Sequence, residues 1–181
     1  MERSLAQSGA KVLIVRAGDF FGPKPGGNWL AQGLVKAGRR IAAVTYPGPL
    51  DRPHAWAWLP DLAETMVRLA EREDLAQVEV FHHRGHVLTG AELVATLEAA
   101  AGRRLAVQTF PWFALKALAP FNETFREMLE MRYLWDEALV LDNARLVARL
   151  GAEPHTPVVE ALRAALAGMD ALPRPALKLA A

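Results

Sequence analysis

Residues 11–23, KVLIVRAGDFFGP, contain the clearest fold signal in the chain. Val12 to Val15 is an unbroken aliphatic and β-branched run, which is typical of a parallel strand buried on both faces. Such a strand requires a neighbour on each side and helices across its faces. Ten residues precede Lys11, enough for one short helix over residues 2–7. We therefore predict an α/β chain that corresponds to the second half of a larger protein.

The composition narrows the classes of function. The 181 residues are 52% hydrophobic and carry a net charge of +1, which gives no electrostatic reason to expect a nucleic-acid partner. The absence of cysteine excludes disulfides, zinc–thiolate sites and a cysteine nucleophile. No apolar run is long enough to cross a bilayer, so we expect a cytoplasmic protein with no membrane partner.

Periodicity and capping residues predict alternating strands and helices. Asn28, Asp61 and Thr89 are expected N-caps, and Thr89 with Glu92 forms a capping box. Further strands are expected at 41–46, 54–59, 78–81 and 105–110. Helices are expected at 29–37, 61–72, 91–101, from 111, at 121–133, 144–150 and 156–167.

The order and spacing of three motifs resemble a known family. They are residues 12–23, VLIVRAGDFFGP, residues 54–64, HAWAWLPDLAE, and residues 150–157, LGAEPHTP. Together they are similar to the C-terminal portion of the extended short-chain dehydrogenase/reductases, also called the NAD-dependent epimerase/dehydratase family. The resemblance implies the C-terminal part of a Rossmann-like parallel sheet plus a small mixed α/β substrate-binding domain.

The same resemblance divides the chain. Residues 1–23 and 61–101 correspond to remnants of the Rossmann-like part, and residues 24–60 and 102–170 to the substrate-binding part, followed by a tail at 171–181. The parent enzyme would bind NAD or NADP. Its acidic or basic residue that selects between the two has no counterpart here.

Two family motifs are missing from the sequence. No Gly-x-x-Gly-x-x-Gly turn is present to hold a pyrophosphate, because the glycine-rich segment 22–27 also holds two prolines. The Tyr-x-x-x-Lys pair is absent too, since Tyr46 and Tyr133 are followed four residues later by Leu50 and Glu137. We therefore predict no catalytic residue in this chain, no activity and no NAD(P) binding when it is alone.

Eight residues are candidate contacts to cofactor or substrate. The resemblance implies cofactor contacts for Ala17, Gly18 and Asp19, and substrate contacts for Asn28 and Trp29. Phe20 is added because it follows the first strand, and His54 and Trp56 because they alternate along one face of a strand, which would suit an apolar or ring-bearing substrate. We expect substrate between residues 19–20 and a single wall made by residues 28, 29, 54 and 56. Each group has a structural alternative: a turn at 17–19, an N-cap with a core anchor at 28–29, and a strand packed into the core at 54–58.

Three other clusters have simpler interpretations. His82, His83 and His86 are expected to be loop histidines rather than metal ligands. The charges between residues 123 and 132 predict the solvated face of a helix. The apolar residues between 110 and 118 could line a substrate cavity, form core or make a dimer contact.

The sequence thus predicts the substrate-binding C-terminal portion of an NAD(P)-dependent epimerase, dehydratase or oxidoreductase, inactive alone. Its substrate would be a small molecule, with a nucleotide sugar as one option. A missing N-terminal half or a second copy of the chain would be its protein partner. The alternative is a non-enzymatic interaction or ligand-binding module derived from the same fold.

Overall fold

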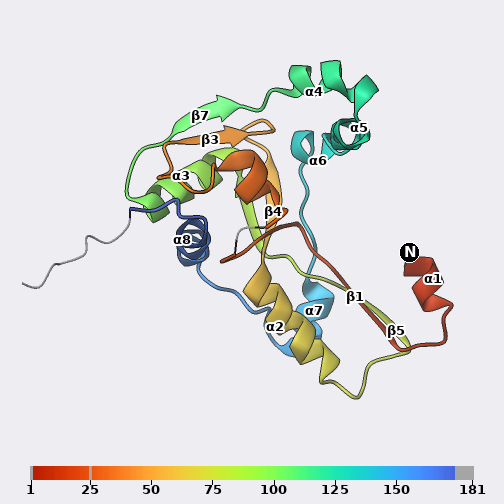
Figure 1. The fold of residues 1–181 in the computed structure, drawn as a ribbon. Helices are drawn as coiled ribbons and strands as arrows, with labels where there is room; N and C mark the ends of the chain where they lie inside the picture. The colour runs from red at the N-terminus through yellow and green to blue at the C-terminus, as the bar shows by residue number, and fades with distance from the viewer. Residues whose placement is uncertain (1, 25, 174–181) are drawn as a thin grey trace, which may run out of the picture.

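The computed structural model describes residues 2–24 and 26–173 (Figure 1). The strands are β1 (Val12–Arg16), β2 (Asp19–Phe21), β3 (Ala43–Tyr46), β4 (Pro53–Trp58), β5 (Val78–His82), β6 (His86–Thr89) and β7 (Ala106–Thr109). The helices are α1 (Glu2–Ala6), η1 (Leu30–Leu34, a π-helix), α2 (Leu59–Ala70), α3 (Gly90–Ala101), α4 (Trp112–Leu118), η2 (Ala119–Phe121), α5 (Glu123–Glu130), α6 (Tyr133–Asp136), α7 (Ala144–Leu150) and α8 (Val158–Gly168). From residue 174 onwards the predicted tail lies outside the described residues.

The described strands form three small sheets, and most of their pairs are parallel. β1 pairs with β5 and β3 pairs with β7, both in parallel. β4 lies between β2, which runs parallel to it, and β6, which runs antiparallel. The α/β fold class with parallel pairing is therefore confirmed.

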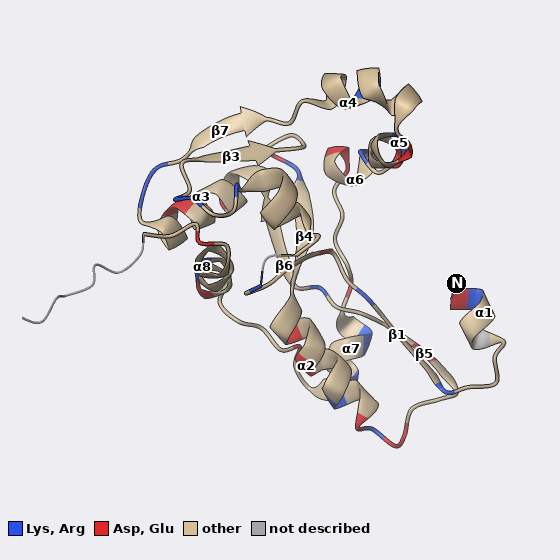
Figure 2. Ribbon diagram, viewed as in Figure 1, with Lys and Arg blue, Asp and Glu red and all other residues tan. Residues whose placement is uncertain are grey.

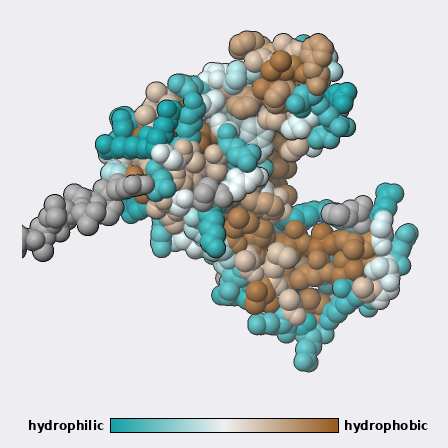
Figure 3. Space-filling view, in the orientation of Figure 1, coloured by the Kyte–Doolittle hydropathy of each residue, from teal (hydrophilic) through white to brown (hydrophobic). Residues whose placement is uncertain are grey.

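The expected burial of β1 on both faces is wrong for this chain. Among the described residues, β1 pairs only with β5, with Val12 opposite Val78 and Arg16 opposite His82. The run from Leu13 to Val15 is consequently half-buried. Figure 3 shows hydrophobic surface over this part of the molecule. The expectation fails because no described strand lies along the second edge of β1.

Two apolar clusters hold the fold together. In the larger one, α3 and α8 pack against each other, and Leu97 and Leu166 are fully buried. The smaller one joins α2, β5 and α7 through Leu69, Phe81 and Leu146. The division of the chain into Rossmann-like and substrate-binding parts stays a prediction.

Charged residues flank the smaller cluster on α7. Arg145 is ion-paired with the buried carboxylate of Glu79 on β5 and donates to the carbonyl oxygen of Val80 at 2.8 Å. Arg149 reaches Asp74 at 2.8 Å. Basic residues on α7 and acidic residues near β5 are visible in Figure 2. These pairs tie α7 to β5 at the edge of the cluster.

One predicted N-cap is confirmed and two differ from the prediction. Thr89 and Glu92 form the capping box of α3. The N-cap position of η1 is Trp29, and Asn28 Oδ1 accepts from the backbone N–H of Ala31 at 2.9 Å one residue earlier. Asp61 is not a cap, because α2 begins two residues earlier, at Leu59. Its carboxylate instead accepts two hydrogen bonds from Thr156, both at 2.7 Å. Asp61 therefore anchors the segment before α8.

Three further elements differ from expectation. The helix expected over 121–133 is divided into the end of η2, α5 and the start of α6, because Asn122 and Met131 interrupt it with a cap at each end of α5. The short strands β2 and β6 were not predicted at all. Both are held by long-range pairing with β4, which local sequence patterns do not report.

Candidate functional site

An acid–imidazole pair lies just beyond the carboxyl end of β1. Asp19 begins β2, and its Oδ2 lies 2.7 Å from Nε2 of His54 on β4. The His54 side chain is 4% exposed, whereas the Asp19 side chain is 25% exposed. Ligands of open α/β sheets bind at the carboxyl ends of the strands. The pair thus joins a buried base to a carboxylate that solvent reaches.

Hydrogen bonds hold both ring nitrogens of His54. Nδ1 lies 3.1 Å from the carbonyl oxygen of Leu134, which can only accept, so Nδ1 carries a hydrogen. Nε2 lies 2.7 Å from Oδ2 of Asp19, whose carboxyl group solvent reaches. The pair therefore connects a fixed imidazole to a solvent-facing carboxyl group.

Aromatic rings fix this pair from the sides. The His54 ring is stacked on Trp135, with centroids 4.1 Å apart and planes 4° from parallel. Trp135 also packs edge-on against Tyr46, with centroids 5.7 Å apart. Burial, with the nearby Asp19 charge as the smaller cause, raises the pKa of the Tyr46 hydroxyl to about 12. Tyr46 is therefore a neutral phenol at ordinary pH.

Gly18 allows β2 to approach β4 closely. A Cβ atom at this position would overlap the backbone carbonyl oxygen of Ala55, so only glycine fits. The predicted turn at 17–19 is thus a connection between two strands, and Asp19 belongs to the second strand. The predicted cofactor contacts of Ala17, Gly18 and Asp19 stay predictions.

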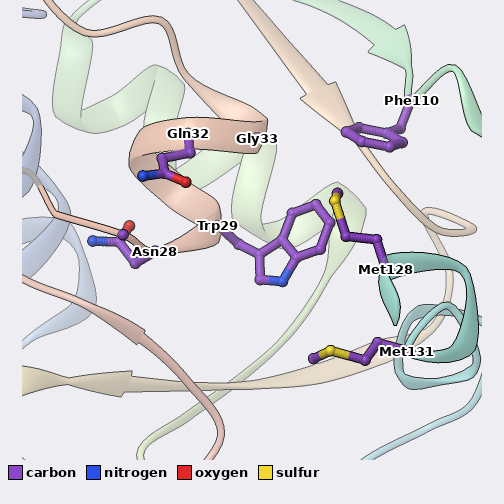
Figure 4. A pocket seen from close by; sticks show the side chains of 8 residues that line it. Asn28, Trp29, Gln32, Gly33, Phe110, Met128 and Met131 are labelled. Carbon is purple, nitrogen blue, oxygen red and sulfur yellow. The ribbon is translucent and has the colours of Figure 1, made fainter. Parts of the chain in front are cut away.

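A cavity lies beside this aromatic group, at η1 and α5 (Figure 4). Its volume is about 330 Å³. It is lined by Gly27, Asn28, Trp29, Gln32, Gly33, Phe110, Met128 and Met131. Trp29 connects it to the acid–imidazole pair, because its ring lies 5.2 Å from that of Trp135. Of the predicted substrate residues, only Asn28 and Trp29 line this cavity.

The other predicted substrate residues lie elsewhere. His54 is behind Trp135, and Trp56 is 1% exposed in the core, where it packs edge-on against Phe21. Phe20 points outward and is 47% exposed. The single wall expected from 28, 29, 54 and 56 is therefore divided, because Trp135 stands between its two halves.

The sequence did not indicate several residues that complete the site. Trp135 belongs to the short helix α6, which carries no motif. Met128 and Met131 belong to a segment whose charges predict a solvated face and whose apolar residues, Met128 among them, predict a core face. Phe110 lines the cavity, as one of the three alternatives for the 110–118 cluster allowed. Helical spacing at 128 and 131 was the only available signal.

Of the three expected loop histidines, one lies in a loop and two lie in strands. His82 ends β5 and His86 begins β6, whereas His83 lies in the loop between them and is fully buried. Nε2 of both His83 and His86 has no hydrogen-bond partner within the described residues. Burial lowers the pKa of His83, and lowers that of His86 to about 4. Both rings are therefore neutral at ordinary pH.

Glu153 holds the loop between β5 and β6 through hydrogen bonds. Its carboxylate accepts from the backbone N–H groups of Arg84 and Gly85 at 2.9 and 2.8 Å, and from Asn143 at 2.8 Å.

Within residues 2–24 and 26–173, no group of three or more metal-ligating side chains could hold a metal ion. Nor is any helix in those ranges long and apolar enough to span a membrane.

Comparison with known proteins places this geometry in context. No protein-family model matches this chain, and no curated protein matches it. Several solved structures do match it. RMD from Pseudomonas aeruginosa, in complex with NADPH, aligns with a TM-score of 0.61 and 19% identity over 93% of this chain and 52% of that chain. This chain therefore has the same fold as about half of that structure.

Two further structures agree with this fold. UDP-glucose 4-epimerase from Bifidobacterium longum, in complex with NAD⁺ and UDP, gives a TM-score of 0.58 and 17% identity over 93% of this chain and 50% of that one. L-threonine 3-dehydrogenase from Trypanosoma brucei gives a TM-score of 0.56 and 15% identity, over 86% of this chain and 45% of that one. This chain spans about half the length of each of these three structures. The expected resemblance to a portion of these enzymes is confirmed at the level of the fold.

Proposed function

We propose that this chain is the substrate-binding portion of an NAD(P)-dependent enzyme that oxidises or reduces, epimerises or dehydrates a small molecule. The observation that carries the proposal is the Asp19–His54 pair. It lies directly after the carboxyl end of β1 and is connected to the cavity through Trp135 and Trp29. An acid–imidazole pair at the carboxyl end of a strand, with a ligand-sized cavity on the other side of Trp135 and Trp29, supports such chemistry.

The residues present fit only one end of a dinucleotide. In this proposal Ala17 and Asp19, which follow β1, contact the nicotinamide ring, which supplies hydride chemistry when the cofactor is bound. Gly18 lies directly against the backbone carbonyl of Ala55, so there is no room beside it for a pyrophosphate. The sequence contains neither Gly-x-x-Gly-x-x-Gly nor Tyr-x-x-x-Lys. In this proposal, an N-terminal nucleotide-binding half provides both.

The role of the chain itself is to hold substrate and to position Asp19. His54, fixed by the carbonyl of Leu134 and by stacking on Trp135, holds the Asp19 carboxyl group in place at the end of β1. The half-buried Trp29 offers an apolar wall for the substrate. Neither role requires the chain to bind cofactor alone, and we expect it not to.

The test has two arms. Titration of the chain with NADH and NADPH, followed by nicotinamide fluorescence, should show no saturable binding in the micromolar range. The genomic sequence upstream of the Met1 codon is then searched for an in-frame glycine-rich turn and Tyr-x-x-x-Lys, and the longer product is expressed. That product should bind NADH or NADPH, and Asp19→Asn should lower its turnover while Asp51→Asn, at an exposed carboxylate, should not.

Each arm can contradict the proposal. Micromolar cofactor binding by the chain alone would show that it is not merely the substrate-binding portion. A longer product that carries both motifs and binds neither cofactor would remove the enzymatic function. The absence of an in-frame upstream half would favour the ligand-binding module instead.

A further inference from the structure

The chemistry of the cavity at η1 and α5 restricts what it can bind. Its volume of about 330 Å³ lies at the lower end of the roughly 300–1,000 Å³ typical of small-molecule sites. None of its eight lining residues carries a charge. Its side-chain polar groups are two amides, Asn28 and Gln32, and the indole N–H of Trp29. All of these groups are neutral.

The two amides offer only neutral donors to an anion. Asn28 Oδ1 accepts from the backbone N–H of Ala31, which leaves the Nδ2 group as its donor, and Gln32 is exposed at the rim. Phosphate and diphosphate groups are bound most strongly in proteins by arginine and lysine. Neither arginine nor lysine lines the cavity. A doubly charged diphosphate would therefore exchange its hydration for neutral donors alone.

The cation next in sequence to the lining is already engaged. Arg132 follows Met131, and its guanidinium group lies 5.6 Å from the centre of the Trp112 ring. Its Nε is also 3.2 Å from the carboxylate of Asp136. Both interactions hold Arg132 on the outer side of Trp112. It is not among the residues that line the cavity.

The walls suit a flat apolar group. Trp29 is fixed by ring contacts with Phe110 at 5.7 Å and with Trp135 at 5.2 Å between centroids. Figure 4 shows Met128 and Met131 beside the Trp29 indole, with the amides on the other side. Aromatic faces pack well against rings, and methionine thioethers adapt to their edges. The cavity therefore combines one rigid aromatic wall with one adaptable thioether wall.

We propose that this cavity binds an uncharged, ring-bearing apolar molecule, with the ring between Trp29 and the thioethers of Met128 and Met131. The inference rests on the proposed function in so far as it makes this molecule the substrate. It narrows that function, because it replaces the nucleotide-sugar option by a neutral apolar substrate.

The experiment uses N-phenyl-1-naphthylamine, a neutral fluorescent ring compound, with the whole chain. Its emission should rise saturably on binding. The double variant Met128→Gln with Met131→Gln should weaken binding by about tenfold, because it replaces apolar wall with amide. Phe113→Gln is the matched control, since Phe113 is 80% exposed on α4 and lies outside the cavity. UDP and UDP-glucose at millimolar concentration should not displace the probe.

The outcomes separate this inference from the proposed function. Displacement by micromolar UDP or UDP-glucose would overturn the neutral-ligand assignment, as would equal probe affinity in the methionine double variant with unchanged circular dichroism. Probe binding that depends on the methionines supports the assignment even where the longer gene product binds no NADH. In that case the cavity is a ligand site and the enzymatic proposal is the one that fails.

Discussion

Mild acidification should destabilise the chain through His86. The ring is 5% exposed and packs on that of His155 with centroids 4.5 Å apart. Burial first, and then the positive charge that His155 can carry, lower the pKa of His86 from 6.5 to about 4, and His83 acts in the same direction. The carboxylates of Asp61 and Glu153 oppose this shift without cancelling it.

The sign and size of the effect follow from proton linkage. Because the folded pKa of His86 lies below its unfolded value, the unfolded chain takes up the proton first as pH falls. The stabilisation is therefore complete above pH 6.5 and is lost as pH falls towards 4. A fall of the pKa from 6.5 to about 4 corresponds to about 1.3 kcal/mol lost between pH 7.5 and 5.5.

The measurement is urea unfolding at these two pH values, followed by tryptophan fluorescence. Between pH 5.5 and 7.5 most aspartate and glutamate side chains stay ionised, so they contribute little to the difference. The free energy of unfolding should fall by about 1.3 kcal/mol or more in the parent chain, since the pKa of His83 is lowered too. His86→Gln should reduce the loss. His82→Gln, at the half-buried end of β5, should retain it.

Two results would refute this reasoning. One is a parent chain whose unfolding free energy is the same at both pH values. The other is a His86→Gln variant that folds at pH 7.5 and still loses as much stability as the parent. His86→Phe provides a second, non-titrating replacement where the glutamine variant does not fold.

Three other changes should lower stability by amounts that the local contacts suggest. Thr89→Ala removes the capping box of α3 and should cost about 1 kcal/mol in urea unfolding. Asp19→Asn leaves buried His54 facing an amide and should cost about 1–3 kcal/mol, measured in the same way. Gly18→Ala forces a methyl group into the carbonyl of Ala55, so the melting temperature and the soluble yield should both fall.

Matched controls distinguish these effects from general sensitivity. Thr124→Ala, at an exposed position of α5, and Asp51→Asn, at an exposed carboxylate, should leave the unfolding free energy within about 0.5 kcal/mol of the parent. Gly26→Ala should be tolerated, because its Cβ would meet nothing closer than 4.0 Å. A control that costs as much as its partner variant would contradict the assigned contact.

Much of the candidate site could be named from sequence, but its arrangement could not. Asp19, Asn28 and Trp29 were selected from the family resemblance, and His54 from the alternation of large side chains over residues 54–58. The sequence did not show that only Asn28 and Trp29 among them line the same cavity. Trp135 separates His54 from Trp29, and no motif announces it.

The sequence by itself determined the α/β class, the Val12–Val15 strand, the capping box at Thr89 and the resemblance to part of an epimerase. These features depend on neighbours a few residues apart, whose periodicity and capping chemistry are written locally. Only the tertiary structure decided that β1 has one partner and that β2 exists. It also brought Asp19 to His54 across 35 residues and Leu134 to the same ring across 80. Contacts at such separation depend on how helices and strands pack, so no local pattern can specify them.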